Sequence, residues 1–201
     1  GKQVPWESSS LRGDFTFLTP GNTLENYHFG PLTPEEKKLL EAKNKKISAL
    51  KEEIQYFEGL QPMTEDAVHQ VGVLFKELAQ IEAEHAVLNR RDTILADMHL
   101  ALIDELVNSE AAGISQLDKL EEYYETVSSL NASHKGLATR DYNRANLYLS
   151  DIKKLTQKEG YHEALDLVED AMDEVEDKRF KQHQAELKAE IRSARPTIVG
   201  F

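Results

Sequence analysis

Apolar residues recur at helical spacing through most of the chain after residue 33. The first run begins with Thr-Pro-Glu-Glu at residues 33–36, which is typical of a helix start because threonine caps free N–H groups and acids face the positive end of the helix dipole. One heptad seam, interrupted by Lys43, holds Leu40, Ile47, Leu50, Ile54 and Phe57. The pattern predicts a helix over residues 34–58, ended by Gly59 and Pro62.

The second run carries the strongest periodic pattern. Thr64 is the predicted N-cap, and two alternating seam positions then recur with a heptad period as far as Leu106. Because a helix rises about 1.5 Å per residue, we expect one continuous helix roughly 60 to 70 Å long. It would form a coiled-coil hairpin with the first helix. We assign its seam to Leu78, His85, Leu88, Asp92, Leu95 and His99.

Three more helices are predicted, over residues 114–131, over 142–158 and from residue 161 onward as one long helix that reaches Ile191. The predicted fold class is therefore mainly α, with a long coiled-coil helical hairpin, further packed helices and one N-terminal β-strand. The expected divisions of the chain are a strand at 1–18, a linker at 19–33, the coiled-coil hairpin at 34–110, a helical bundle or repeat-like region at 111–195 and a tail at 196–201.

The N-terminal strand has no clear partner in this sequence. Leu11, Phe15 and Phe17 alternate with polar residues, which is the pattern of a half-buried strand. A strand needs a neighbour to pair its backbone N–H and C=O groups. Only residues 196–201 are otherwise β-prone, and that segment is short. We therefore expect Leu11, Phe15 and Phe17 to pack in a sheet or dimer interface supplied by another part of a longer protein.

Composition narrows the function. The formal charge of -12 argues against a sequence-independent nucleic-acid binder and against docking on an anionic membrane. No apolar run reaches the roughly 20 residues that span a bilayer. The chain has no cysteine, so it can hold no disulfide, thiolate metal site or cysteine nucleophile of its own. We expect no cofactor and no metal. The compartment is not fixed by the sequence, with the cytoplasm favoured.

The N-terminal stretch also carries a family resemblance. Residues 2–17, KQVPWESSSLRGDFTF, resemble the last strand of the small subunit in caspase-like cysteine peptidases, where Q-[IV]-P is followed by L-x-x-[DE]-[FL]-x-F. Bacterial caspase-like proteins carry a version P-W-x-S-S-S-L-x-G-[DE]-F, which Pro5, Trp6 and residues 8–15 satisfy. The resemblance implies that residues 1–17 close an α/β sheet, and that the catalytic His and Cys lie upstream.

On this hypothesis the chain, which begins at Gly1 instead of a methionine, is the non-catalytic C-terminal part of a caspase-like peptidase. Its helical region would recognise a partner protein, oligomerise the peptidase or cover its substrate groove, and its partners would include the upstream peptidase domain or another copy. The alternative is a free-standing helical adaptor whose strand joins a partner's sheet.

Several polar patterns have weaker functional interpretations. His85, Asp92 and His99 could set helix register or respond to pH, or could face solvent where the partner helix ends. Two Glu-x-x-His pairs, Glu82/His85 and Glu159/His162, match the spacing used by di-iron bundles, which also need two further core carboxylates. Residues 160–164, with Ala171, resemble the turn and the second helix of a tetratricopeptide repeat. A single such unit is interpreted as an ordinary helical hairpin.

Overall fold

The structure is a computed structural model that describes residues 31–194. The described residues belong to two compact units, one ending at Ala42 and the other beginning at Lys43. The helices are α1 (Pro34–Glu58), α2 (Glu65–Ile81), η2 (Ala86–Arg90), α3 (Arg91–Asn108), η3 (Ile114–Gln116), α4 (Leu117–Leu130), η4 (Lys135–Thr139), α5 (Arg140–Gln157), α6 (Tyr161–Glu174) and α7 (Lys178–Ala194). No strand occurs between residues 31 and 194, and the mainly α fold class is confirmed. The predicted strand, with Leu11, Phe15 and Phe17, lies outside the described residues.

Side-chain caps fix the first two helix starts, as the sequence predicted. Thr33 N–H donates to Glu36 Oε2 at 2.7 Å, and Glu36 N–H donates to Thr33 Oγ1 at 3.2 Å, which is a reciprocal capping box. Ala67 N–H donates to Thr64 Oγ1 at 3.2 Å. The predicted bounds of α1 and the predicted N-cap of α2 are therefore confirmed.

The predicted continuous helix after Thr64 is wrong in its middle. α2 ends at Ile81, a turn follows, and the short 3-10 helix η2 leads into α3. His85 stabilises this turn, because its Nδ1 accepts the N–H of Val87 at 3.2 Å and so caps the first turn of η2. Neither glycine nor proline marks the break, and apolar residues continue at heptad spacing on both sides of it. The spacing of apolar residues therefore did not indicate that the chain reverses direction here.

The predicted long helix after residue 161 is also divided. α6 ends at Glu174, and α7 begins at Lys178. Val175 between them is extended, with φ -107 and ψ 123, and is fully buried. Asp177 starts α7 because its carboxylate accepts the N–H of Phe180 at 3.2 Å. This N-cap lies inside an acidic run, in which nothing local distinguishes Asp177 from its neighbours.

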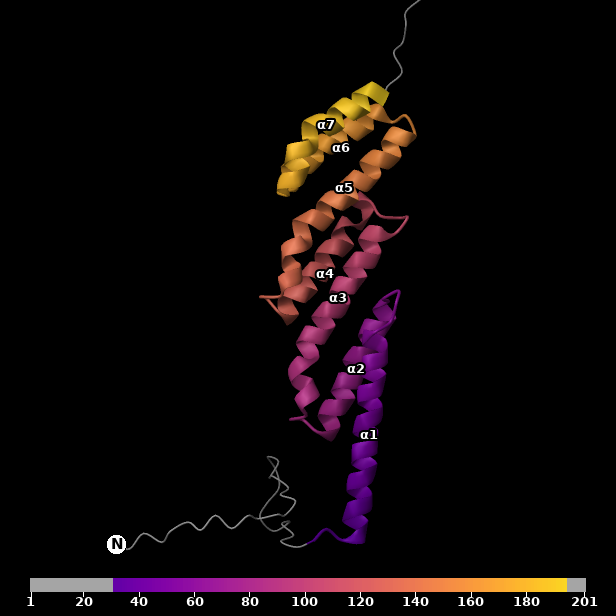
Figure 1. Ribbon diagram of the computed structural model, residues 1–201, viewed down its shortest axis with the longest axis vertical. Helices are drawn as coiled ribbons and strands as arrows, with labels where there is room; N and C mark the ends of the chain where they lie inside the picture. Colours follow the sequence, from indigo (N-terminus) through magenta and orange to yellow (C-terminus); the bar gives the residue numbers. More distant parts are fainter. Residues whose placement is uncertain (1–30, 195–201) are drawn as a thin grey trace, which may run out of the picture. The chain divides into compact units, whose positions relative to one another are not determined.

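The helices after α1 form three pairs that repeat one pattern. Pair 1 is α2, η2 and α3, pair 2 is α4, η4 and α5, and pair 3 is α6 and α7. Successive helices reverse direction, and α3 packs along α4 as α5 packs along α6 (Figure 1). The first helix of each pair buries four equivalent side chains, which are Val71, Leu74, Phe75 and Leu78, then Leu120, Tyr123, Tyr124 and Val127, then Ala164, Leu167, Val168 and Ala171. The hairpin predicted around residues 160–164 is formed by α5 and α6, the second helix of pair 2 and the first helix of pair 3.

Pairs 1 and 2 also share the turn that joins their helices. Each turn begins with the motif His-x-x-Leu-x-x-Arg-Asp, at residues 85–92 and at residues 134–141. His134 Nδ1 accepts the N–H of Gly136 at 3.1 Å, as His85 accepts that of Val87. Pair 3 lacks this turn, because only residues 175–177 connect α6 to α7. The three pairs are therefore alike in their first helices and differ in this connection.

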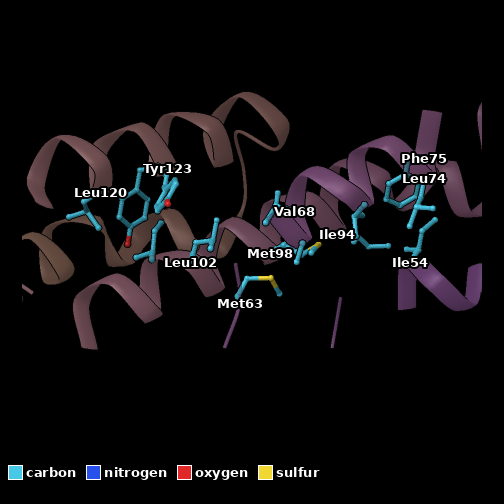
Figure 2. Close-up of a cluster of buried hydrophobic side chains, with 14 of the residues drawn as sticks. Ile54, Met63, Val68, Leu74, Phe75, Ile94, Met98, Leu102, Leu120 and Tyr123 are labelled. Atoms are coloured by element: carbon cyan, nitrogen blue, oxygen red, sulfur yellow. The ribbon is translucent and has the colours of Figure 1, made fainter. Parts of the chain in front are cut away.

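Two clusters of buried side chains hold the helices of the second unit together. The first cluster joins the four helices α1, α2, α3 and α4, with Phe75, Ile94 and Leu120 among its members (Figure 2). It includes residues from both sides of position 110, and the predicted domain limits stay predictions. The second cluster joins α5, α6 and α7 around Ile152. Helix α5 belongs to both, because Leu147 lies in the first cluster and Ile152 in the second.

Candidate functional site

The structure disperses the residues that the sequence assigned to one coiled-coil seam. Leu78 is fully buried in α2, Leu88 lies in η2, and Asp92, Leu95 and His99 lie in α3. His85 is a capping residue of the turn. His99 Nδ1 lies 2.8 Å from Leu95 O, and its ring packs edge-on against Tyr123 with 6.1 Å between ring centres. The six residues form no continuous stripe, and His85, Asp92 and His99 have separate surroundings.

A polar groove lies between pairs 2 and 3. It has a volume of about 410 Å³ and is walled by η3, α4, α5 and α6. Ile114, Leu117 and Leu167 supply its apolar surface. Its charged side chains are Asp118, Glu121, Arg144, Asp170 and Glu174, and the Tyr148 ring also lines it. We call this site the polar groove; its lining combines four carboxylates with one guanidinium group.

Glu121 organises one wall of the polar groove by holding two arginines of α5. Its Oε1 accepts from Arg144 Nη2 at 2.5 Å and Nε at 3.1 Å, and its Oε2 accepts from Arg140 Nε at 2.6 Å and also from Nη2. Burial raises the pKa of the Glu121 carboxyl, but the two guanidinium groups lower it more, so that its pKa lies below the ordinary value. The carboxylate is thus charged at neutral pH and fixes the start of α5 against α4.

Arg144 and Tyr148 connect the same wall to α6. Arg144 Nη1 donates to the backbone oxygen of Glu174 at 3.0 Å, and the Tyr148 hydroxyl donates to Glu174 Oε2 at 2.6 Å. Burial and the neighbouring Glu174 carboxylate raise the pKa of Tyr148, so that its hydroxyl keeps its proton. The C-terminal end of α6 is therefore held by two side chains of α5. Within the polar groove, Glu121, Arg144, Tyr148 and Glu174 are therefore hydrogen-bonded to one another.

A related polar cluster lies between pairs 1 and 2. Glu65 Oε1 accepts from Tyr123 Oη at 2.5 Å and pairs with Lys119 Nζ at 2.7 Å. Lys119 lowers the pKa of Glu65, whereas burial and then the Glu65 carboxylate raise the pKa of Tyr123 to about 12. Here a lysine of α4 neutralises the carboxylate. The cluster between pairs 1 and 2 therefore lacks the excess of carboxylates that the polar groove has.

The groups proposed as di-iron ligands do not converge. Glu82 is the C-cap of α2 and pairs with Lys43 Nζ at 3.1 Å, while His85 bonds the backbone of η2. Glu159 lies in the turn before α6 with φ of 63, and His162 lies in the first turn of α6. Between residues 31 and 194 no three His, Cys, Asp or Glu side chains are placed to hold one metal ion.

Comparisons of the chain with protein-family models, curated proteins and solved structures found no match. Among residues 31–194, no helix combines the length and the apolar content that crossing a bilayer requires. The interpretation of the site therefore rests on the geometry and charge of the helices themselves.

The sequence patterns did not predict the residues of the polar groove. Tyr148 falls at an apolar helical position, and Glu121 and Arg144 resemble ordinary surface charges. The groove becomes visible only when pairs 2 and 3 are recognised as successive units, because its walls come from both. Aligning residues 85–92 with 134–141 is the signal that would have revealed the series of pairs and thus a groove between neighbours.

The Glu121 cluster predicts a change in acid stability. Because the folded-state pKa of Glu121 is lowered, its contribution is present above the usual value of 4.5 and is lost as the pH falls through the folded pKa. Glu121→Gln should cost about 0.5 to 1 kcal/mol at neutral pH, and this difference from the unaltered protein should shrink below roughly pH 4.5. Urea unfolding across the acid range, monitored by circular dichroism, measures both effects.

Glu122→Gln removes an equal charge from the next position of α4, where the side chain is exposed. It should leave the neutral-pH stability within about 0.5 kcal/mol of the unaltered protein. Equal losses for the two variants at every pH would contradict the role assigned to the Glu121 cluster.

Proposed function

We propose that the helices of residues 43–194 form a protein-binding module that receives a cationic segment of a partner in the polar groove. A volume of about 410 Å³ lies within the range of pockets that hold side chains or small ligands. Helical-repeat proteins typically bind partners along surfaces made by successive units. The groove's composition gives the preferred charge of the partner.

The observation that carries this proposal is the excess of carboxylates in the groove. Asp118 and Asp170 are exposed and approach the groove from α4 and α6. Arg140 and Arg144 neutralise the charge of Glu121, whereas the carboxylates of Asp118 and Asp170 are available to pair with an incoming ligand. Lysine or arginine side chains of a partner would meet them, while Ile114 and Leu167 supply apolar contact. The net charge of -12 also attracts a basic partner from a distance.

The test is a selection of random displayed peptides on the 201-residue chain, followed by measurement of their dissociation constants by fluorescence anisotropy. The informative variant is Asp118→Asn/Asp170→Asn, which leaves the Glu121 and Tyr148 bonds in place. Its matched control is Asp166→Asn/Asp173→Asn, which removes the same charge from exposed positions outside the groove. The selected peptides should be rich in Lys and Arg, and the groove variant alone should weaken their binding at least about tenfold.

Equal weakening by both variants would mean that the net charge of the chain attracts the peptides, and the groove would then have no specific role. Selection of acidic or purely apolar peptides would contradict the proposal as well.

We further propose that this module is the C-terminal part of a caspase-like peptidase and serves its regulation, oligomerisation or partner recognition. What supports this is the likeness of residues 2–17 to the last strand of that family, and these residues lie outside the described part of the structure. The alternative remains a free-standing helical adaptor. The mass of the endogenous polypeptide with peptide mapping separates them, because only a peptidase tail has Cys- and His-containing peptides upstream of Gly1.

A further inference from the structure

A second groove lies on α5 and α7. It has a volume of about 270 Å³ and is mainly apolar, with Tyr142, Leu149 and Leu187 among its lining residues. Tyr142 is 41% exposed and Leu149 is 38% exposed, although both are large side chains. Single exposed apolar residues are common on protein surfaces, but these two open into the same hollow. We refer to this site as the α5–α7 groove.

The equivalent surface of pair 1 is covered by the turn of pair 2. Leu100 of α3 corresponds to Leu149 of α5, and it is partly buried because the turn at Gly136 lies directly against it. A Cβ at Gly136 would come within 2.3 Å of Leu100 Cδ1. Asp97 corresponds to Asn146, and its Oδ1 lies 3.1 Å from His134 Nε2. The turn thus covers one apolar and one polar side chain of the preceding pair.

Pair 3 does not supply this cover to pair 2. Residues 131–139 connect α4 to α5 and include η4, whereas residues 175–177 connect α6 to α7 without a 3-10 turn. Asn146 and Leu149, the counterparts of Asp97 and Leu100, consequently line the α5–α7 groove. The groove occupies the place where the repeated pattern would put a His-x-x-Leu turn.

The charges around this groove indicate what could take that place. Asp177, Glu186 and Glu190 line it together with the apolar residues, and no lysine or arginine is among those lining residues whose side chains the structure describes. Asp177 already accepts the N–H of Phe180, while Glu186 and Glu190 are exposed on α7. A segment with positive charge beside an apolar side chain matches this arrangement. The turn of pair 2 has this character, because residues 131–140 contain Lys135, Leu137 and Arg140 and no acid.

We propose that the α5–α7 groove binds a turn segment of a partner protein, with an apolar side chain packed on Leu149 and Leu187 and flanking Lys or Arg residues paired with Glu186 and Glu190. The inference rests on the proposed role as a protein-binding module and adds a second site to it. A second copy of this chain is a poor occupant, because a symmetric contact through the groove would set its carboxylates against themselves. The partner's polar group would bond Asn146, as His134 bonds Asp97.

The experiment uses a synthetic peptide of residues 131–140 as the probe and the isotope-labelled 201-residue chain as the target. Chemical-shift mapping should place the peptide on Asn146, Leu149 and Leu187. A peptide with Lys135→Glu/Arg140→Glu should bind at least about tenfold more weakly, and so should one with Leu137→Ser. In the chain, Leu149→Gln should weaken binding by a similar factor. Leu39→Gln is the matched control, because Leu39 is 75% exposed and lies outside the groove.

Each other outcome overturns the proposal. Absence of binding, equal binding of the charge-reversed peptide, or unchanged binding to Leu149→Gln would show that the groove does not recognise such a segment. Self-association that Leu149→Gln abolishes would identify a second copy as the occupant. If the probe peptide bound the Phe201→Ser variant but not the unaltered chain, the occupant of the groove would be the chain's own C-terminal tail, residues 196–201. If peptides from the random selection still bind the polar groove, the proposed function stands although this inference fails.

Discussion

Replacing Tyr124 by phenylalanine should destabilise the protein by about 1 to 3 kcal/mol, although it removes a single oxygen atom. Tyr124 is fully buried, and its hydroxyl accepts from Asn143 Nδ2 at 2.8 Å and donates to Thr139 Oγ1 at 2.9 Å. Thr139 in turn donates to the backbone oxygen of Gly136 at 2.8 Å. Without the tyrosine oxygen, the buried Asn143 amide loses its partner. The free energy of unfolding in urea measures the loss.

Pair 1 provides the matched variant for this prediction. The positions of Tyr124 and Asn143 are occupied there by Phe75 and Ile94, and both are buried in the same cluster (Figure 2). The double variant Tyr124→Phe/Asn143→Ile should therefore be within about 1 kcal/mol of the unaltered protein, because it removes both hydrogen-bonding groups together. If the double variant loses as much free energy of unfolding as the two single variants together, Tyr124 and Asn143 are not equivalent to Phe75 and Ile94.

The second large effect is expected at Ile152, which is 1% exposed in the cluster formed by α5, α6 and α7. Ile152→Ala should cost about 2 to 5 kcal/mol, because it removes buried methyl groups and leaves a cavity. In a series of stacked pairs this loss should be local. We expect amide hydrogen exchange to accelerate most in α5, α6 and α7, while α2 and α3 stay protected.

Ile103→Ala is the control, since Ile103 holds the equivalent position of α3 and is fully buried in the first cluster. It should produce a loss of similar size, with the fastest exchange in α2, α3 and α4. If both variants accelerate exchange equally along the whole of residues 43–194, the helices unfold as one cooperative unit. The division into two separately responding clusters would then be contradicted.

The sequence predicted helices where local signals were strong. Thr33 and Thr64 marked two starts correctly, and Gly59 and Gly160 lie at breaks that the structure contains. Breaks without such residues were missed. The turn at His85 uses a histidine ring as a cap, and the turn before α7 uses Asp177 within an acidic run, so neither differs locally from a helical sequence.

The sites were harder to predict than the helices because they depend on how the pairs meet. Glu121, Arg144 and Glu174 are far apart in sequence, and their contact follows from the packing of α4, α5 and α6. The α5–α7 groove is open because the connection in pair 3 is short, and this difference appears only when that connection is compared with the longer turn of pair 2. Aligning the sequence with itself would have indicated both grooves, because the motif of residues 85–92 recurs at residues 134–141 and reveals the series of helix pairs.

The most direct test of the partner-binding role is amide hydrogen exchange of the 201-residue chain with and without a saturating amount of a selected basic peptide. We expect slower exchange in the segments that wall the polar groove, namely residues 114–121 with η3 and the start of α4, residues 144–148 of α5 and residues 167–174 of α6. Unchanged exchange in all three segments, or protection confined to α1, α2 and α3, would contradict it.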